Sequence, residues 1–346
     1  MVARIQFTGP TRYRVRSAAE LGQSILEVCS RRMLKGPQRP SWNWFVEVAT
    51  AMLKRQVRTA FELHDVEEAR RYLDSVVIRS PSLSAVNITP LVHEKFRGSW
   101  FFPKNAEPHE TVLYLHGGGY SFYPQAYPSF IALITQAVNS RTFALDYRLA
   151  PEHRFPAQLE DALSAYQWLL ENGTDPDNLI FAGDSAGGSL ALALLLKVRD
   201  LKLPLPALCI VLSPATNFES EIVGNEASDW IDKRSLLQWR DWFCEPSQRR
   251  DPLVSPLRAD LRGLPPIYMQ AGREEILYDS IQAFAAHARA QGAEVVLESW
   301  ADMNHDFQIF GPDAPQSAEA LTRIGEVIDT QVRGRKRPEL VPAMGR

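Results

Sequence analysis

Cysteine is scarce in this chain, which has only Cys29, Cys209 and Cys244 among its 346 residues. So few thiols at such distances exclude a disulfide framework and a cysteine-based metal site, and we expect three ordinary free thiols. Long apolar runs are missing as well, since no stretch approaches the roughly 20 apolar residues of a membrane span. We therefore expect a cytoplasmic protein with no integral membrane association and no bound metal.

An excess of basic charge is also absent. The formal net charge is -3, from 38 Lys and Arg against 41 Asp and Glu, and the two signs are interspersed over most of the length. This pattern excludes an extended nucleic-acid surface. The short basic tail at 331–346 is interpreted as a solvated terminus. Trp and Phe residues near the start leave loose contact with lipid surfaces open.

From Val112 onward, the chain alternates short apolar runs with longer segments of helical period. Helices are clearest at 157–170 and 276–290, which end near Gly173 and Gly292. Such alternation predicts right-handed crossovers and a mostly parallel sheet covered on both faces. The runs that we expect to be buried strands are 112–115, 142–145, 179–182, 209–212, 267–270 and 295–298.

Two parts of the chain interrupt this pattern. Residues 1–85 show helical periodicity with no strand between the helical segments, and 86–93 can then pair with 95–102 as an antiparallel hairpin. The hairpin brings the expected sheet to about eight strands. Residues 217–255 carry aromatic side chains in helical surroundings where a plain crossover would be shorter. The two helical insertions suggest one composite cap.

The segment Gly183-Asp184-Ser185-Ala186-Gly187 lies between the apolar run 179–181 and the helix-forming stretch 190–196. A serine in a sharp strand-to-helix turn needs small neighbours, because strand and helix pack closely around it. Gly183 and Gly187 meet this need. The turn lifts the serine hydroxyl clear of the sheet, and the helix N-terminus favours a developing negative charge. The segment therefore predicts a nucleophile elbow around Ser185.

A serine hydroxyl needs a base to take its proton, and the base needs an orienting acid. Carboxylates follow the strand 267–270, and His305 follows the next strand along the chain. Both loops are therefore expected at the same edge of the sheet as the elbow. The order Ser, acid, His, each after a different strand, is that of the α/β-hydrolases.

Three consecutive glycines, at positions 117–119, follow directly on the strand 112–115 and the histidine His116. Glycines let the backbone turn its N–H groups toward a substrate oxygen without obstruction by side chains. A flexible turn would have the same composition. Because this loop comes after a buried strand and upstream of the elbow, we interpret it as an oxyanion hole.

With these motifs in this order, the chain closely resembles the hormone-sensitive-lipase family of α/β-hydrolases, which includes bacterial carboxylesterases and arylacetamide-deacetylase relatives. The resemblance covers residues 85–325 and rests on the segments 116–119, 146–153 and 183–188 and on the acid and histidine loops. It implies an α/β-hydrolase fold with a helical cap over the active site. The implied site residues are Ser185 as nucleophile, His305 as base and then acid, and the N–H groups of Gly118, Gly119 and Ala186 as oxyanion donors.

The resemblance also divides the chain into parts. The N-terminal part of the cap takes residues 1–85, and 217–255 form its second part. The catalytic core takes 86–216 and 256–330, followed by the basic tail.

The acid departs from the usual family pattern, in which Asp stands three residues after the glycine. This chain has Glu275 there, which we predict to be the triad acid, with Glu274, Asp279 and Asp302 as competitors. Asp306 follows the base where the family often has Gly. Facing the imidazole, its charge would raise the pKa of His305, whereas a solvent-facing carboxylate would have little effect.

Four further residues are candidate substrate contacts. Tyr120 and Phe218 are expected in the pocket wall because their neighbours are catalytic. Trp239 belongs to an aromatic group for which core packing within the cap is an equal interpretation. Asp184 adjoins the nucleophile, where structural hydrogen bonding is the competing role.

The predicted function is that of a serine carboxylesterase acting on small to medium apolar esters through an acyl-enzyme, with no metal or organic cofactor. The sequence leaves open an amide, a lactone or an acetylated natural product as substrate, because it does not place the cap residues that contact the leaving group. A catalytically silent ligand-binding module is the third hypothesis, against which the presence of Ser185 and His305 counts. Monomer and homodimer both remain open.

Overall fold

The computed structural model describes residues 4–334 except 64, 107 and 220–223, so residues 335–346 of the predicted tail lie outside the described residues. In the described part of the chain, eight strands form one sheet in the order β10-β9-β8-β7-β5-β6-β4-β3. Their bounds are β3 (Val86–Val92), β4 (Arg97–Pro103), β5 (Thr111–Leu115), β6 (Arg141–Asp146), β7 (Leu179–Asp184), β8 (Leu208–Leu212), β9 (Ile267–Gly272) and β10 (Val295–Trp300).

Strands β5 to β10 run parallel to one another, and β4 and β3 continue the sheet antiparallel at one edge. This arrangement confirms the predicted α/β-hydrolase fold, the six predicted strands and the predicted hairpin. In that hairpin Val86 pairs with Pro103 and Val92 with Arg97. The expectation that 295–298 is a buried strand is wrong, because β10 lies at the other edge of the sheet and Val296 is half exposed.

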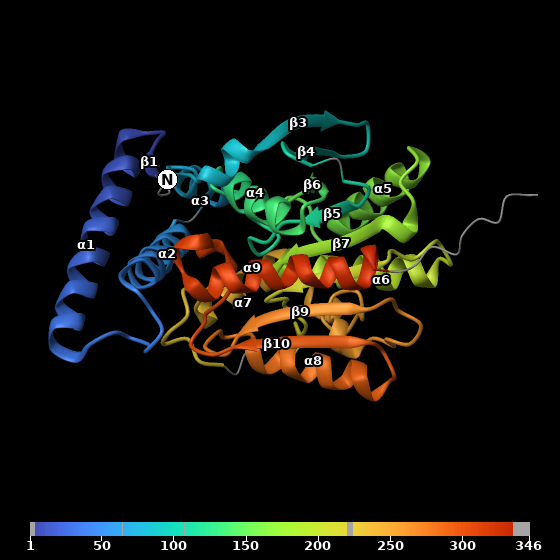
Figure 1. Ribbon diagram of the computed structural model, residues 1–346. Coiled ribbons are helices and arrows are strands. Elements are labelled where there is room, and N and C mark those ends of the chain that lie inside the picture. Colours follow the sequence, from blue (N-terminus) through green and yellow to red (C-terminus); the bar gives the residue numbers. More distant parts are fainter. Residues whose placement is uncertain (1–3, 64, 107, 220–223, 335–346) are drawn as a thin grey trace, which may run out of the picture.

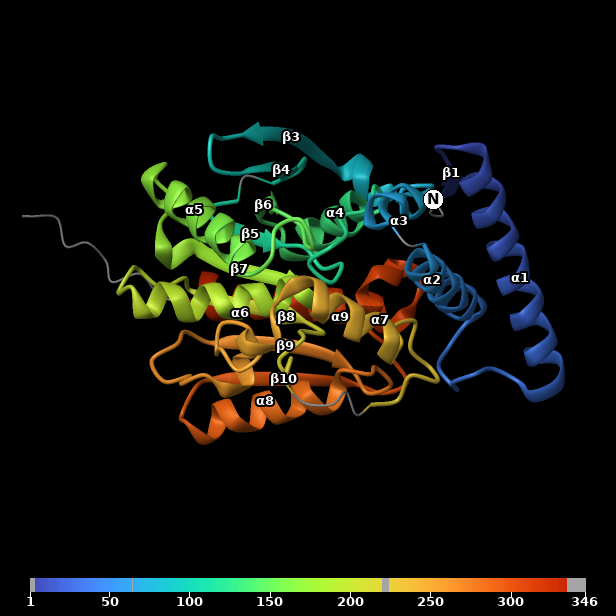
Figure 2. The same cartoon turned by 180° about the vertical axis from the view of Figure 1, so that it is seen from behind.

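Helices cover both faces of the sheet. Successive side chains of a strand point to opposite faces, so the apolar side chains on each face need apolar partners. Val112 and Tyr114 of β5 belong to one core with α4 and α9, whereas Leu113 and Leu115 belong to the other with α5, α6 and α8. Figure 1 shows α9 across the front of the sheet, and Figure 2 shows α6 across the opposite face. The bounds are α4 (Tyr127–Val138), α5 (Ala157–Glu171), α6 (Ser185–Asp200), α8 (Tyr278–Ala290) and α9 (Pro315–Ile328).

The N-terminal part consists of α1 (Thr11–Lys35), α2 (Trp44–Glu62) and α3 (Val66–Leu73), with α1 lying at the outer side of α2 in both views (Figures 1 and 2). The prediction of helices here is confirmed, but the expectation that no strand lies among them is wrong. Strands β1 (Arg4–Phe7) and β2 (Val76–Arg79) pair as a small antiparallel sheet. Each is too short to show a period, and the partners lie some seventy residues apart in the chain.

The segment 217–255 contains α7 (Lys233–Phe243), which packs against α2. Arg58 of α2 pairs with Asp232 at 3.0 Å, and the ring of Phe61 lies 5.2 Å from that of Trp239. The two helical insertions therefore touch each other above the ends of the strands. No helix in the described ranges has both the length and the apolar character to cross a bilayer.

Candidate active site

Ser185 stands at the junction of β7 and α6, with a positive φ of 50°. The two flanking glycines allow this turn. A Cβ on Gly183 would lie 2.4 Å from the Gly187 carbonyl oxygen, and a Cβ on Gly187 would lie 2.0 Å from that of Leu115. Both contacts involve backbone, which has little freedom to move, so glycine is required on each side. The predicted elbow is present as a structure.

His305 lies on the loop after β10, as predicted, and reaches back to the elbow. Its Nε2 is 2.8 Å from Ser185 Oγ, within hydrogen-bonding distance. The histidine side chain is fully buried and that of the serine is nearly so. A base in this position can take the serine proton directly.

Of the four candidate acids, the structure brings Glu275 to the histidine. Its Oε1 lies 4.0 Å from His305 Nδ1, and both atoms lack a hydrogen-bond partner among the described residues. Glu274 instead pairs with Arg39, Asp302 accepts from the Ser41 backbone, and Asp279 is exposed in the first turn of α8.

Ser213, which the sequence analysis missed, joins the acid loop to the base loop. Its hydroxyl donates to Glu275 Oε2 at 2.7 Å and accepts from the Asp306 backbone N–H at 3.1 Å. The same Glu275 oxygen also accepts from the Gly272 N–H at 3.1 Å. The signal in the sequence was its place directly after the buried strand β8, at the edge where the predicted site residues gather.

Asp306 is buried and faces the imidazole, with Oδ2 3.2 Å from His305 Nε2. Burial alone would lower the pKa of His305, but the nearby carboxylates of Asp306, Glu275 and Asp229 outweigh burial and raise it. Burial raises the pKa of Glu275 above its ordinary value. An ionised Asp306 can only accept a hydrogen bond, so it favours a proton on Nε2, the atom that must be free to act as base.

Asp184 holds the glycine loop against the elbow. Its buried carboxylate accepts from the hydroxyls of Tyr114 and Tyr127 and, at 3.1 Å, from the Gly117 backbone N–H. A Cβ on Gly117 would lie 2.3 Å from this carboxylate, so the loop can approach only with glycine there. The carboxylate is fully buried and accepts from three donors, and the geometry therefore favours the structural role of Asp184 over contact with a substrate.

Tyr147 of the motif 146–153 supports the glycine loop through contacts with His116. The His116 ring is stacked between Tyr123 and Tyr147, with centroids 4.0 and 4.1 Å away, and its Nδ1–H donates to the Gly117 carbonyl at 2.7 Å. Tyr147 also donates to the His116 carbonyl oxygen at 2.6 Å. Burial lowers the pKa of His116 to about 3, so this ring is neutral. His116 is a supporting residue rather than a second base.

The predicted oxyanion donors are two glycines of the loop and the residue after the serine. Gly118 and Gly119 have positive φ of 93° and 61°, and Ala186 is the second residue of α6, directly after the serine. Since Asp184 occupies the Gly117 N–H, the next two amides of the loop remain the candidates for binding a substrate oxygen.

Three aromatic candidates surround this loop. Trp239 packs its ring directly on Gly119, where a Cβ would come within 2.4 Å of the indole. Tyr120 stacks on Phe243 at 3.7 Å between centroids, and Phe218 lies 6.3 Å from Tyr120. The structure therefore places Trp239 against the glycine loop and Phe218 next to Tyr120, the residue that follows this loop.

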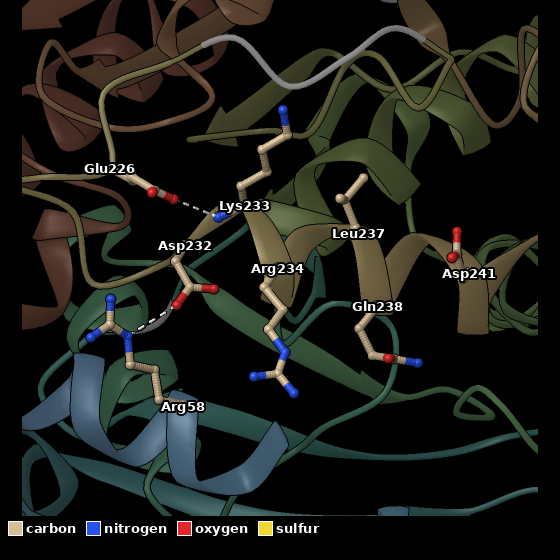
Figure 3. Close-up of a pocket in the computed structure, with 8 residues that line it drawn as sticks. All are labelled: Arg58, Glu226, Asp232, Lys233, Arg234, Leu237, Gln238 and Asp241. Atoms are coloured by element: carbon tan, nitrogen blue, oxygen red, sulfur yellow. Dashed lines mark hydrogen bonds and ion pairs between the residues drawn. The ribbon is translucent and has the colours of Figure 1, made fainter. Parts of the chain in front are cut away.

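A cavity of about 530 Å³ lies along α7 beside Arg58 of α2 and is lined mostly by charged and polar side chains (Figure 3). Ser185 and His305 are not among its lining residues, and its acidic and basic groups are mixed. This cavity is therefore not the site of the chemistry.

No cluster of three or more His, Cys, Asp or Glu suited to a metal ion occurs among the described residues.

The fold and this geometry define the class of the protein. The family model Abhydrolase_3, which describes the alpha/beta hydrolase fold, matches residues 112–309, more than half of the chain. The matched range contains the glycine loop, the elbow, Glu275 and His305.

Relatives make the class more specific. An acetyl-hydrolase of Streptomyces hygroscopicus is 36% identical over 225 residues, 64% of this chain and 75% of that protein. An esterase of Acinetobacter venetianus is 31% identical over 293 residues, 82% of this chain and 95% of that protein. The crystal structure of an esterase from the bacterial hormone-sensitive lipase family has 33% identity and a TM-score of 0.73, covering 82% of this chain and 98% of that chain. The chain belongs to the hormone-sensitive-lipase family of α/β-hydrolases, which confirms the predicted family and the class of carboxylic ester hydrolase.

Proposed function

We propose that this protein is a serine carboxylesterase that hydrolyses small to medium apolar esters through an acyl-enzyme. The observation that carries the proposal is the 2.8 Å separation of Ser185 Oγ from His305 Nε2, with the serine held on an elbow beside a glycine loop. A nucleophile, a base and backbone donors in this arrangement are the parts that acyl transfer requires.

In the proposed reaction, Ser185 Oγ attacks the ester carbonyl carbon while His305 Nε2 takes the hydroxyl proton. The carbonyl oxygen becomes an oxyanion and accepts from the N–H groups of Gly118, Gly119 and Ala186. His305 then gives its proton to the leaving alcohol, and the acyl-serine ester remains. Water repeats the sequence with the same base, releasing the acid and free Ser185.

Glu275 is the proposed acid, which orients the imidazole and stabilises its charged form. At 4.0 Å, Oε1 and Nδ1 are farther apart than a hydrogen bond allows. We expect this distance to shorten when substrate binds, because catalytic hydrogen bonds are often long before the substrate complex forms. No metal or organic cofactor takes part in the scheme.

The proposed cap consists of residues 1–85 and 217–255, over a core of 86–216 and 256–330. Contacts between α2 and α7 support it, as does Trp239 of α7, which packs on the glycine loop. A large indole at this point leaves little room beside Gly119, which favours short acyl groups. The name of the acetyl-hydrolase relative agrees with that preference.

The test is a panel of p-nitrophenyl esters of graded acyl length, with the wild type and Ser185→Ala. We expect turnover by the wild type, fastest for short chains, and a loss on the order of 10⁴-fold or more in the variant. Equal turnover by both proteins would contradict the proposal. Matched anilide and lactone substrates test the preference for esters.

A cytoplasmic location and a monomeric or homodimeric state belong to the same proposal. Cell fractionation with an antibody to the protein checks the location. Light scattering of the purified chain measures the number of subunits.

A further inference from the structure

Asp229 is a buried carboxylate from the segment 217–255 that lies between the acid loop and the base loop. Its Oδ2 accepts from the backbone N–H of Ile276 at 2.8 Å, next to Glu275. Its Oδ1 accepts from the backbone N–H of His305 at 3.2 Å. One side chain therefore holds the backbone beside the proposed acid and the backbone of the proposed base.

The donors around this carboxylate stabilise its ionised form. Besides His305 and Ile276, the backbone N–H of Trp230 donates to Oδ1 at 2.8 Å. Three N–H groups thus point at two oxygens, and both oxygens act as acceptors. These donors favour the charged form and oppose the effect of burial, which raises the pKa of Asp229.

A second bond from the next residue reinforces the contact with the base loop. The indole Nε1–H of Trp230 donates to the His305 carbonyl oxygen at 2.7 Å, and the two rings lie 5.3 Å apart. Both backbone groups of His305 are thus bound by the pair Asp229-Trp230.

The pair is itself anchored to α2. Lys54 Nζ donates to the carbonyl oxygens of Asp229 and Glu226 at 2.9 and 2.7 Å. Thr50 accepts from the side-chain amide of Asn304 at 2.9 Å, one residue before the base. The N-terminal helices and the segment 217–255 therefore meet at the base loop.

We propose that Asp229 is a positioning residue, which fixes the separation of the Glu275 and His305 loops and so sets how closely the acid approaches the base. The proposal rests on the proposed function, since it assigns Asp229 a task only if Glu275 and His305 act together. Asp229 does not contact the nucleophile, so it acts through the two loops.

The charge of Asp229 gives the proposal a second consequence. The charged groups that face the imidazole are Asp306, Glu275 and Asp229, and Lys54 lies behind Asp229 on α2. Removal of one negative charge lowers the pKa of His305, so the acidic limb of activity moves to lower pH. A residue that only stabilised the fold would leave this limb in place.

The experiment compares Asp229→Asn and Asp229→Ala with the wild type on a short-chain aryl ester. Asn keeps one acceptor oxygen, which can still serve His305 and Trp230, but its NH₂ then faces the Ile276 N–H. We expect kcat to fall about 10- to 100-fold in Asn and further in Ala, with KM changed less than about threefold. The acidic limb of kcat is expected at lower pH in both variants.

Asp232→Asn is the matched control. This carboxylate lies three residues along the chain, caps α7 and pairs with Arg58, away from the two loops. Asn is also a good N-cap, so kcat and the pH profile should equal those of the wild type.

Thermal unfolding and titration of reactive serine with a fluorophosphonate normalise each rate to folded protein. If Asp229→Asn does not fold, Trp230→Phe tests the same hold on the base loop, since it keeps an aromatic ring and removes the donor to the His305 carbonyl oxygen. We expect it to lower kcat about 3- to 10-fold.

Folded variants with wild-type kcat and an unmoved acidic limb of the pH profile would overturn the proposal. Failure of the wild type to hydrolyse any ester would instead contradict the proposed function.

Discussion

The nucleophile half of the site and the acid–base half are held by different means. Around Ser185, close backbone contacts at Gly183 and Gly187 and the Asp184 hydrogen bonds fix the turn and the glycine loop. Around His305, the acid loop and the base loop are joined by side chains, and the acid stands 4.0 Å from the base. The first half is rigid by packing, whereas the second depends on polar contacts between distant segments. We therefore expect substitutions in the nucleophile half to lower mainly stability and substitutions in the acid–base half to lower mainly activity.

The largest effect is expected in the acid–base half. Glu275→Gln removes the negative charge that would orient the imidazole, and we expect kcat/KM to fall about 10³- to 10⁴-fold with little loss of stability. Steady-state kinetics measures this. Glu274→Gln, one residue earlier and paired with Arg39, is the control and should stay within about threefold of the wild type. A reversed ranking would show that the acid is misassigned.

In the nucleophile half, the expected failure is one of folding. Gly187→Ala would place a methyl 2.0 Å from the Leu115 carbonyl oxygen, between a strand and a helix that cannot separate. We expect the free energy of unfolding to fall by about 3–5 kcal/mol, measured by urea denaturation. Gly22→Ala in α1 has open space around the new methyl and should be neutral or slightly stabilising. A Gly187→Ala protein as stable as the wild type would contradict the packing argument.

The two halves meet where His305 Nε2 contacts Ser185 Oγ, and the pH dependence of activity reports on the protonation of this nitrogen. Because nearby carboxylates raise the pKa of His305, we expect activity to increase as the pH rises above the ordinary histidine range. Asp306→Asn removes the nearest negative charge, so we expect the acidic limb of kcat/KM to move about one pH unit lower. The variant would then be faster than the wild type at pH 6. An unchanged limb would mean that Asp306 does not act on the base.

The smallest effect is expected from a single hydrogen bond of the nucleophile half. Tyr127→Phe removes one hydroxyl donor from Asp184, which keeps Tyr114 and Gly117. We expect the free energy of unfolding to fall by about 1–2 kcal/mol and kcat/KM to change less than about threefold. Tyr166→Phe is the matched control, because it loses a bond to the Pro204 carbonyl away from the site. A large loss of activity in Tyr127→Phe alone would show that Asp184 tunes the chemistry as well as the loop.

Much of the fold could be predicted because parallel strands buried on both faces are continuous apolar runs. Each of the six predicted runs is a strand of the sheet. The pair β1 and β2 escaped prediction, since four-residue strands carry no period and their pairing depends on how the N-terminal helices fold back. Asp229 and Ser213 escaped for a related reason. Their partners lie 76 and 62 residues away, at His305 and Glu275, and no pattern among neighbouring residues in the sequence indicates such contacts.

By itself, the sequence determined the elbow and the glycine loop, because their chemistry lies in adjacent residues whose small size is a local requirement of the backbone. Only the tertiary structure decided which carboxylate faces His305. Glu274, Glu275 and Asp279 share one loop and helix start, and which side chain turns inward depends on contacts with β8, the base loop and the segment that contains Asp229. Tertiary structure also turned Asp306 toward the imidazole, since direction and burial are properties of the packed molecule.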